Sequence, residues 1–365
     1  MSGKKQYGFG IIGCGMISEF HAQAIKAMDK AELVCVMDRH PDAACKVARE
    51  CGCTAYDDLD KFLAHPGLDI VTIATPSGTH LEPCEKAALA GKHIICEKPL
   101  EVTLERVDRM IRVCEENKVT LAGIFPRRFH QSTLEFKKAL DEGRLGQVTL
   151  ADAYIKWYRT QEYYDSGAWR GTWDLDGGGA LMNQSIHTID LLCHLAGEVD
   201  SVCAFADLAM HERIEVEDNA AAVVRFKSGA LGVIEGSTSC FSNTGHPAEV
   251  HVCGSKGSVF MKDDAFTVWD FQEPLPADEE IRQRFKPQEG VGAGAADPKA
   301  ISFVGHQVNF EDVVAALEEG RKPAVDGYEA RKSIEIILAV YASALAGGKL
   351  IRLPLAATPE RKSFR

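Results

Sequence analysis

Two short segments of the sequence carry side chains that can move protons. Asn183 and His187 lie four residues apart in GGGALMNQSIHTID, so a helix would place an amide and an imidazole on one face, one turn apart. An imidazole titrates near neutral pH and serves as a general acid or base. Taken alone, however, a lone helical histidine is more often a core residue bonded to a backbone carbonyl. The role of His187 therefore depends on what faces it.

Lys98 in CEKPL directly follows an apolar, strand-like run. A lysine there is a compact donor that can hold a substrate hydroxyl, although Lys-Pro after a strand is also an ordinary turn. Ligands of open α/β sheets bind outside the carboxyl ends of the strands. We therefore expect Lys98 to point into that crevice.

A glycine-rich turn precedes both segments in GIIGCGMIS, between the first expected strand and helix. Gly13 permits a tight turn, and Gly15 lets the backbone approach a pyrophosphate. A helix that starts at Met16 and Ile17 would offer unpaired N–H groups and the positive end of its dipole to the phosphates. Ser18 stands where the third glycine of the usual pattern would pack the helix on the strand.

Asp38 ends the second expected strand, 20 residues after Ser18. A carboxylate there accepts hydrogen bonds from the ribose hydroxyls and repels a 2′-phosphate, which favours NAD. Arg39 is suited to pair with such a phosphate or to stack on adenine, so NADP remains the alternative cofactor.

These residues need a scaffold, and the hydrophobic pattern from residue 7 to 125 provides one. Short apolar runs alternate with longer amphipathic stretches, which indicates a parallel sheet covered on both faces. The expected strands are 7–12, 31–38, 53–56, 68–75, 92–96 and 119–125. The expected helices are 16–28, 41–51, 57–64, 77–90 and 103–117.

The pattern changes after residue 126. A helix at 131–142 precedes a strand at 148–158, a polar loop and a helix that ends near Gly197. Consecutive strands then follow without crossover helices, which predicts a mostly antiparallel sheet. They are expected at 200–208, 218–226, 229–239, 248–254, 257–262 and 265–270, with helices at 305–319 and 327–346.

The sequence thus predicts an α/β Rossmann domain followed by an α+β domain with a mostly antiparallel open sheet. We place the first domain at 1–125, a substrate and oligomerisation domain at 126–355, and a frayed tail at 356–365. Residues 273–303 are too long for a plain connector, and such a loop is usually functional or disordered.

Composition narrows the class of protein. The net charge of −12 argues against binding nucleic acid or an anionic membrane through a general field. No apolar run reaches the roughly 18–20 residues of a membrane span, and no cleavage site follows the N-terminus, which favours the cytoplasm. The twelve cysteines are scattered without a CxxC pair, so we expect reduced thiols and no metal site.

These motifs together resemble the Gfo/Idh/MocA family of oxidoreductases over nearly the whole chain. The matching segments are the glycine turn, Asp38, TPSGTH, CEKPL, RRF, DGGGALMNQSIHTIDLL and VDGYEARKSIEI. The resemblance implies oxidation of a secondary alcohol on a sugar, polyol or sugar derivative, or reduction of the ketone, with NAD(H) or NADP(H). It also implies a homodimer or homotetramer in which the open sheets of the second domains pack face to face.

The resemblance assigns roles position by position. Lys98 matches the family's catalytic lysine, His187 its acid/base histidine, and Pro99 a proline that is often cis. The cofactor contacts that it implies are Thr75, Pro76, Ser77, His80, Glu97, Lys98 and Arg127.

One position departs from the commoner family pattern. Many members carry an aspartate four residues before the histidine, where this chain has Asn183. An aspartate would favour the charged imidazolium, whereas an amide can orient the ring without supplying charge. The change shifts weight toward Lys98 in proton handling and makes the inositol dehydrogenases a less favoured subgroup. Asp190 could orient His187, or could equally be a helix-surface carboxylate.

An aromatic cluster lies between the first strand of the second domain and the glycine run. Trp157, Trp169 and Arg170 suit a sugar-like ligand, but packing of the loop or of an interface explains the cluster equally well. Arg170 could hold a phosphate or carboxylate, or pair with Asp165 or Asp174.

Two rival functions use the same fold. A redox-neutral glycosidase with resident NAD⁺ would keep the same catalytic residues, and a non-catalytic sensor would not need Lys98 together with His187.

Overall fold

A computed structural model of the chain describes residues 6–287 and 302–364. The chain divides into two compact units, Met1–Pro126 with Ser302–Arg331 and Arg127–Ile301 with Lys332–Arg365. Within the described ranges, no helix is long and apolar enough to span a membrane.

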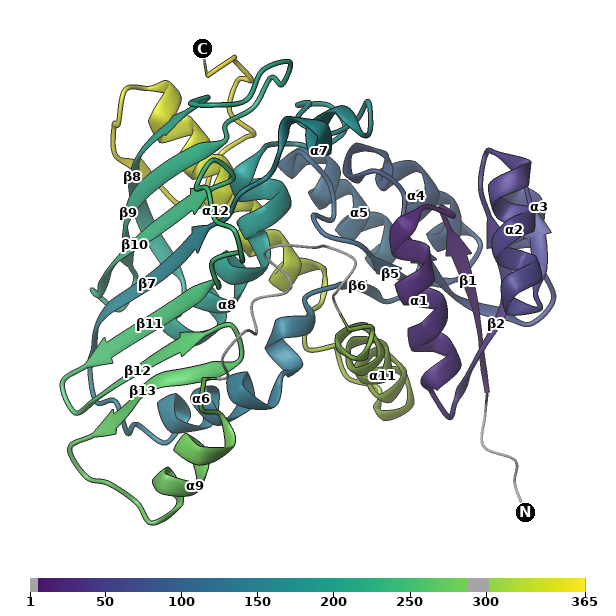
Figure 1. Cartoon of the computed structure of the whole chain (residues 1–365). Coiled ribbons are helices and arrows are strands. Elements are labelled where there is room, and N and C mark those ends of the chain that lie inside the picture. Colours follow the sequence, from purple (N-terminus) through teal and green to yellow (C-terminus); the bar gives the residue numbers. More distant parts are fainter. Residues whose placement is uncertain (1–5, 288–301, 365) are drawn as a thin grey trace. The chain divides into compact units, whose positions relative to one another are not determined.

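The first unit is built on a six-stranded parallel sheet with the order β3-β2-β1-β4-β5-β6 (Figure 1). Its central strand β1 is buried at all six positions, as expected for a parallel strand covered on both faces. Strand order reverses between β1 and β4, which makes a topological switch point. The strands are β1 (Tyr7–Ile12), β2 (Ala31–Met37), β3 (Thr54–Tyr56), β4 (Leu68–Ile73), β5 (His93–Cys96) and β6 (Leu121–Gly123).

Helices connect these strands as the alternating pattern predicts. They are α1 (Met16–Ala27), α2 (Pro41–Cys51), α3 (Leu59–Leu63), α4 (Leu81–Leu89) and α5 (Leu104–Glu116). The helix expected at 77–90 is divided, because a 3₁₀ turn, η1 (Ser77–Thr79), precedes α4.

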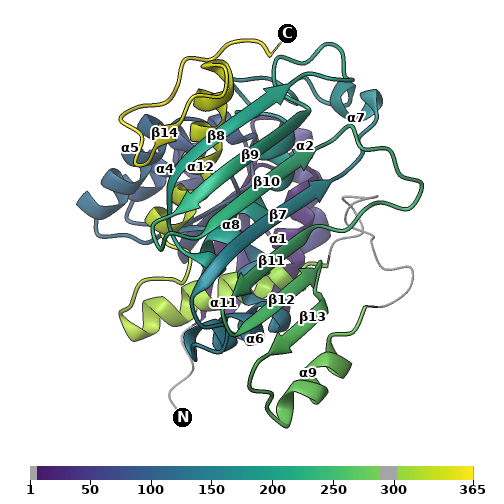
Figure 2. The same ribbon diagram turned by 90° about the vertical axis from the view of Figure 1, so that its left-hand side faces the viewer.

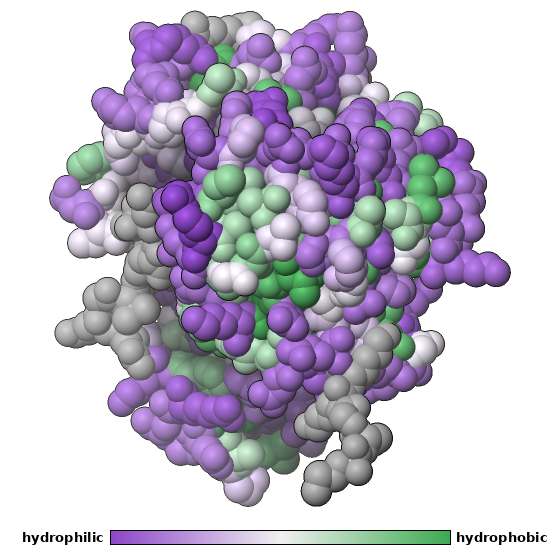
Figure 3. Space-filling model, turned by 90° about the vertical axis from the view of Figure 1, so that its right-hand side faces the viewer, coloured by the Kyte–Doolittle hydropathy of each residue, from purple (hydrophilic) through white to green (hydrophobic). Residues whose placement is uncertain are grey.

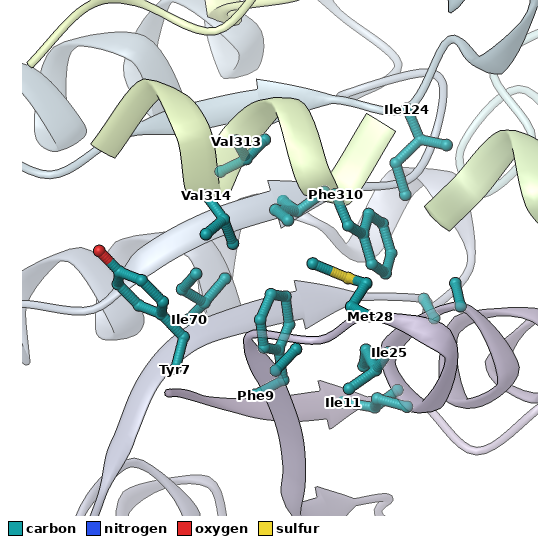
Figure 4. Packing of buried hydrophobic residues seen from close by; sticks show 14 of the residues in the cluster. Tyr7, Phe9, Ile11, Ile25, Met28, Ile70, Ile124, Phe310, Val313 and Val314 are labelled. Atoms are coloured by element: carbon teal, nitrogen blue, oxygen red, sulfur yellow. The ribbon is translucent and has the colours of Figure 1, made fainter. Parts of the chain in front are cut away.

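Residues from the C-terminal part of the chain complete the core of the first unit. Phe310 of α11 (Val304–Glu319) is fully buried, and its ring lies 6.1 Å from that of Phe9 of β1 (Figure 4). Val313 and Val314 join the same cluster. The sequence-based division assigned all of 126–355 to the second domain, whereas 302–331 belongs to the first unit. The apolar face of α11 needs a partner, and no local sequence signal identifies which sheet supplies it.

The second unit contains an eight-stranded sheet in the order β13-β12-β11-β7-β10-β9-β8-β14. Its pairs are antiparallel except β7 with β10, so the expected mostly antiparallel sheet is confirmed with one parallel pair. The strands are β7 (Val148–Lys156), β8 (Val199–Asp207), β9 (Asn219–Phe226), β10 (Leu231–Ser237), β11 (Glu249–Gly254), β12 (Gly257–Lys262), β13 (Ala265–Phe271) and β14 (Ile351–Arg352).

Helices of the second unit pack on one face of this sheet. The helix α8 (Ile186–Ala196) lies against β7 and β11, and the opposite face is turned to the viewer in Figure 2. The open face carries exposed apolar side chains, among them Leu150, Phe205 and Val223. The other helices are η2 (Pro126–Phe129), α6 (Gln131–Asp141), α7 (Gln161–Asp165), η3 (Ala180–Ser185), α9 (Ala277–Arg284) and α12 (Gly327–Leu345), which begins in the first unit.

Two expected irregular segments contain ordered structure. The loop expected at 273–303 includes α9, whose Asp278 accepts a hydrogen bond from the Trp269 indole at 2.8 Å, while 288–301 lies outside the described residues. The tail expected to fray is anchored instead. The ring of Phe364 lies 5.7 Å from that of Trp173, and Arg361 forms a 2.8 Å ion pair with Asp174. Aromatic packing therefore orders the segment that terminal position alone suggested would be loose.

The face of the molecule shown in Figure 3 is mostly hydrophilic, with smaller apolar patches. This surface agrees with a chain that is 26% charged residues.

Candidate active site

The candidate cofactor residues of the first unit gather at one edge of its sheet. Ile12 at the end of β1 is in register with Met37 of β2 and with Ile73 of β4, and Ile73 pairs with Cys96 of β5. The residues that follow these strand ends therefore share the carboxyl edge at the switch point, where α/β sheets bind ligands.

The glycine turn has the shape that a dinucleotide requires. Gly13 has φ +96°, and a Cβ there would lie 2.7 Å from the Ala74 carbonyl oxygen, so a larger residue would be strained. Gly15 is exposed, and a Cβ there would meet nothing within 4 Å, which leaves open space before the start of α1. No side chain of the described residues caps that helix end. Its first N–H groups fit a pyrophosphate.

Residues around this turn take defined positions. Met16 at the start of α1 is 45% exposed, and Ile17 is half-buried. Ser18, in place of the third glycine, is buried and donates its hydroxyl hydrogen to the Gly15 carbonyl at 2.6 Å. A serine therefore fits this position by bonding within its own helix turn.

Asp38 holds the end of β2 against the glycine turn. Its Oδ2 accepts the N–H of Cys14 at 2.8 Å, and its Oδ1 accepts the N–H of His40 at 2.9 Å. The carboxylate is half-buried, and each oxygen retains a lone pair for a ribose hydroxyl. Arg39 is exposed, and its Nε donates to His40 Nε2 at 3.3 Å.

His80 joins two loops at the edge of the sheet. Its ring is fully buried, with Nε2 2.8 Å from the Thr75 carbonyl and Nδ1 3.0 Å from the Pro99 carbonyl. The backbone thus engages both ring nitrogens of a residue that the resemblance implied as a cofactor contact. Pro76 and Thr75 are half-buried, and Ser77 is buried. His80 therefore connects the two loops through hydrogen bonds to their backbones.

Lys98 is the accessible residue of its segment. From residue 94 to 102 every other side chain is buried. The Lys98–Pro99 peptide is cis, as the resemblance implied. The backbone N–H of Lys98 donates to Glu97 Oε2 at 3.1 Å. The chain therefore presents the lysine while its neighbours fix the backbone.

Glu97 points inward, to two histidines. Its Oε1 lies 2.9 Å from His21 Nε2 and 3.3 Å from His306 Nε2, and all three side chains are buried. Hydrogen bonds from His21 and His306 outweigh burial and hold the pKa of Glu97 well below its usual value. Burial lowers the pKa of His21, whose Nδ1 lies 3.1 Å from the Thr72 hydroxyl. Glu97, which the resemblance implied as a cofactor contact, thus links the backbone of Lys98 to two buried histidines.

The sequence indicated no link between His21, Glu97 and His306. Their ligand atoms lie within 4.8 Å of one another, as in metal sites, but direct hydrogen bonds between them already account for this spacing. We therefore interpret the cluster as a buried hydrogen-bond network.

The glycine-rich segment of the second unit presents two side chains in the same manner. From residue 176 to 192, Asn183 and His187 are the residues that are not buried. The segment does not begin as the expected α-helix. A π-helical turn, η3, covers Ala180–Ser185, and α8 starts at Ile186. The Ser185 hydroxyl donates to the Ala180 carbonyl at 2.7 Å, which spans one such turn. Single π turns inside helices are frequent at functional sites.

Glu217 supports this turn, although no motif in the sequence indicates it. Its carboxylate accepts the N–H of Gly179 at 3.0 Å, the N–H of Leu181 at 2.8 Å and the Tyr341 hydroxyl at 2.9 Å. A Cβ on Gly179 would lie 1.8 Å from the Glu217 carbonyl oxygen, which explains the third glycine of the run. Complete burial raises the pKa of Glu217 to about 7, against the opposing effect of these donors.

Asn183 is held by a carboxylate that the sequence pattern did not connect to it. Its Nδ2 donates to Asp176 Oδ1, and Asp176 Oδ2 accepts the N–H of Gly171 at 2.8 Å. The Asn183 Oδ1 accepts from Gln184 Nε2. The negative charge absent at position 183 is therefore supplied one hydrogen bond away, by Asp176.

Two adjacent arginines anchor the start of α8. Arg127 donates to the Thr188 hydroxyl at 3.0 Å and to the Asp263 carbonyl at 2.9 Å. Arg128 forms a bidentate pair with Asp190 at 2.7 and 2.8 Å, with both side chains buried. Asp190 is therefore not the helix-surface carboxylate that the sequence allowed.

The aromatic cluster divides into two parts. Trp173 packs on Tyr341 and the C-terminal Phe364, which is a structural role. Tyr163 instead lies between two arginines, with the Arg170 guanidinium 4.2 Å from its ring centre and that of Arg159 at 5.5 Å. Trp157 and Trp169 flank these arginines at 5.2 and 4.6 Å.

Both units match models of known protein families. A family model described as "Oxidoreductase family, NAD-binding Rossmann fold" matches residues 7–125, and one described as "GFO/IDH/MocA C-terminal domain" matches 133–260. The chain belongs to the Gfo/Idh/MocA family of oxidoreductases, and its first unit is an NAD-binding Rossmann fold.

Individual relatives cover most of the chain. Inositol 2-dehydrogenase of Rhizobium meliloti is 30% identical over 87% of this chain and 91% of its own length. The scyllo-inositol 2-dehydrogenase (NAD(+)) of Bacillus subtilis is 32% identical over 69% of this chain and 72% of its own length. The WlbA dehydrogenase of Bordetella pertussis, solved with NADH and UDP-GlcNAcA, is 34% identical, with a TM-score of 0.85 over 96% of this chain and 98% of that one.

Proposed function

We propose that this protein is an NAD-dependent dehydrogenase that transfers a hydride between the cofactor and a secondary alcohol, or the corresponding ketone, of a sugar, polyol or sugar derivative. One observation carries the assignment of its catalytic residues. Two otherwise buried segments each expose only side chains that handle protons or oxygen, Lys98 in one and Asn183 with His187 in the other. Relatives that act on inositols, and a neighbour solved with NADH and a sugar nucleotide, support the substrate class.

The glycine turn, the start of α1 and Asp38 would hold the cofactor, which supplies the hydride acceptor or donor when bound. Asp38 favours NAD over NADP because its carboxylate would repel a 2′-phosphate. The exposed Arg39 keeps NADP as the alternative. Thr75, Pro76 and Ser77 follow β4 at the same edge and complete the proposed contacts.

We assign His187 as the acid/base residue and Lys98 as the donor that stabilises the developing alkoxide. Asn183 orients the polar groups beside His187, and its own amide is fixed by Asp176 and Gln184. Glu97 and His80 act as positioning residues, since their polar atoms bond to groups of the loop that carries Lys98 and to buried histidines. Arg127 acts in the same way on α8.

The decisive experiment identifies the nucleotide released on denaturation and then screens sugars and polyols for NADH formation. Lys98→Met should lower kcat by about 10²–10⁴ while the cofactor still binds. Lys86→Met makes the same change at an exposed lysine that pairs with Asp60, and should leave turnover intact. Unchanged turnover in Lys98→Met would refute the assignment of Lys98.

The same screen separates the rival functions. NADH released with external NAD⁺ identifies a dehydrogenase, glycoside cleavage without net NADH identifies a redox-neutral glycosidase, and ligand binding without hydride transfer identifies a sensor. The open face of the sheet, with Leu150, Phe205 and Val223 exposed, supports a homodimer or homotetramer through that surface. All twelve cysteines are free thiols, which favours the reducing cytoplasm.

A further inference from the structure

Arg170 lies in the second unit without a carboxylate partner among the described residues. Its Nη1 donates to the Tyr163 hydroxyl at 2.6 Å, and its guanidinium packs over the rings of Tyr163 and Trp169. The side chain is half-buried. The aromatic rings cover the faces of the planar guanidinium group. Its other N–H groups lie in the plane of that group, where they can bind an oxyanion.

The carboxylates that the sequence offered to Arg170 are engaged elsewhere. Asp165 pairs with Arg213 at 2.7 Å, and Asp174 pairs with Arg361 at 2.8 Å. Hydrogen bonds to Arg213 and Gln161 hold the pKa of Asp165 below its usual value. The Asp165 carboxylate is therefore charged and already has its partners. The structure thus removes both intramolecular explanations for Arg170.

A second arginine reinforces the positive charge. Arg159 is only 5% exposed and donates through Nε to Gln184 Oε1 at 3.1 Å. Its guanidinium lies 5.5 Å from the same Tyr163 ring that Arg170 covers. Burial lowers the pKa of Arg159, and the positive charge of Arg170 lowers it further. An anion within reach of both guanidiniums would offset this repulsion.

Asp176 is linked to this group through Asn183 and Gln184. Asp176 already binds the amide of Asn183 and the N–H of Gly171. The Arg159 guanidinium lies 5.2 Å from the ring centre of Trp157, whose indole N–H is buried and has no hydrogen-bond partner among residues 6–287 and 302–364. An unsatisfied buried donor beside an arginine points to an acceptor that arrives with the ligand.

We propose that Arg159 and Arg170, together with the Tyr163 hydroxyl and the Trp157 indole, form a subsite for an oxyanion on the substrate. The substrate is then an acidic sugar derivative whose carboxylate or phosphate binds there. This inference rests on the proposed dehydrogenase function for its substrate class.

The subsite is continuous with the candidate catalytic residues of the same unit. Gln184 Nε2 donates to the Tyr163 hydroxyl at 2.9 Å and also to Asn183 Oδ1. Asn183 is one of the two accessible residues at the start of α8, with His187. A bound oxyanion would therefore set the position of the sugar relative to the residues that act on its hydroxyl.

The test compares matched neutral and acidic probes. Glucose, glucuronate, glucose 6-phosphate, UDP-glucose and UDP-glucuronate are each titrated calorimetrically onto the protein with NADH, and assayed for NADH formation with NAD⁺. Glucose against glucuronate isolates a carboxylate, and glucose against its phosphate or UDP derivative isolates a phosphate. We expect at least one acidic probe to bind about 10-fold or more tightly than its neutral partner.

Arg170→Gln should weaken that acidic probe by about 10- to 100-fold and change glucose by less than about 3-fold. Arg170→Lys retains the charge and should recover part of the loss, which also guards against a folding defect in the first variant. Arg352→Gln removes an exposed arginine of the same unit that pairs with Asp200, and should leave every probe unchanged.

Each outcome decides the matter. Equal binding of neutral and acidic probes, no binding of any acidic probe, or equal weakening of all probes by Arg170→Gln overturns the subsite. Selective binding of an acidic probe that Arg170→Gln abolishes supports the subsite, whether or not that probe yields NADH. The dehydrogenase is overturned when no compound of the wider sugar and polyol screen yields NADH. NADH formation from neutral sugars that is unchanged in Arg170→Gln, with no preference for acidic probes, supports the dehydrogenase and overturns the subsite.

Discussion

Glu217 offers a quantitative test of how the glycine-rich segment is held. Its carboxylate is completely buried and accepts hydrogen bonds from Gly179, Leu181 and Tyr341. Burial raises its pKa from the usual 4.5 to about 7. The folded protein therefore binds this proton more tightly than the unfolded chain does. Folding is favoured by the protonated acid, and stability falls as the pH rises from about 4.5 to about 7.

The size of the effect follows from the two pKa values. Proton linkage gives a loss of about 2–3 kcal/mol in unfolding free energy between pH 5 and pH 8 from this group alone. Glu217→Gln is neutral at every pH and should remove that loss. The new amide NH₂ group would face the N–H of Gly179, so the unfolding free energy changes at every pH as well. The quantity to compare is therefore the difference in unfolding free energy between pH 5 and pH 8.

Tryptophan fluorescence during urea unfolding measures this difference in the correct unit. All four tryptophans lie in the second unit: Trp157, Trp169, Trp173 and Trp269. Glu212→Gln makes the same chemical change at an exposed site five residues earlier, and should keep the wild-type pH dependence. Parallel pH profiles for the wild type and Glu217→Gln would refute the buried, proton-binding carboxylate.

Three further predictions test the other supports of the site. Glu97→Gln removes the charge that accepts hydrogen bonds from two buried histidines, and should lower the unfolding free energy by about 1–3 kcal/mol. It should also lower kcat with little change in NAD affinity. Unchanged kcat in steady-state assays would contradict the positioning role of Glu97. Asn183→Asp sets two carboxylates in contact at Asp176, so the pH–rate profile should gain an ionisation at raised pH, and the Asp176→Asn/Asn183→Asp exchange should restore the hydrogen bond; identical profiles for both variants would argue against the contact. Arg128→Gln leaves Asp190 buried without its partner and should destabilise the second unit by about 3–5 kcal/mol, and a loss below 1 kcal/mol in denaturant would show that the pair is dispensable.

The sequence by itself determined the Rossmann domain and most of the second sheet. Alternating apolar runs and amphipathic stretches have periods that depend only on local geometry, so β1 to β6 and most of the strands of the second unit could be predicted from them. The glycine turn was equally legible, because its φ and its close approach to the Ala74 carbonyl admit little besides glycine. Lys98, Asn183 and His187 could be selected as candidates by type and spacing, and the structure leaves these three accessible in buried segments.

Tertiary structure decided which distant residues support them. His21 and His306 meet at Glu97 from segments 285 residues apart along the chain, and Glu217 reaches back to Gly179. No period or spacing rule encodes such contacts, because they arise from the packing of whole elements. Packing of whole elements also explains why α11 belongs to the first unit and why the predicted helix begins with a π turn. For the same reason Asp190 is buried and pairs with Arg128. Tertiary packing also paired Asp165 and Asp174 with other arginines, and not with Arg170 as the sequence allowed.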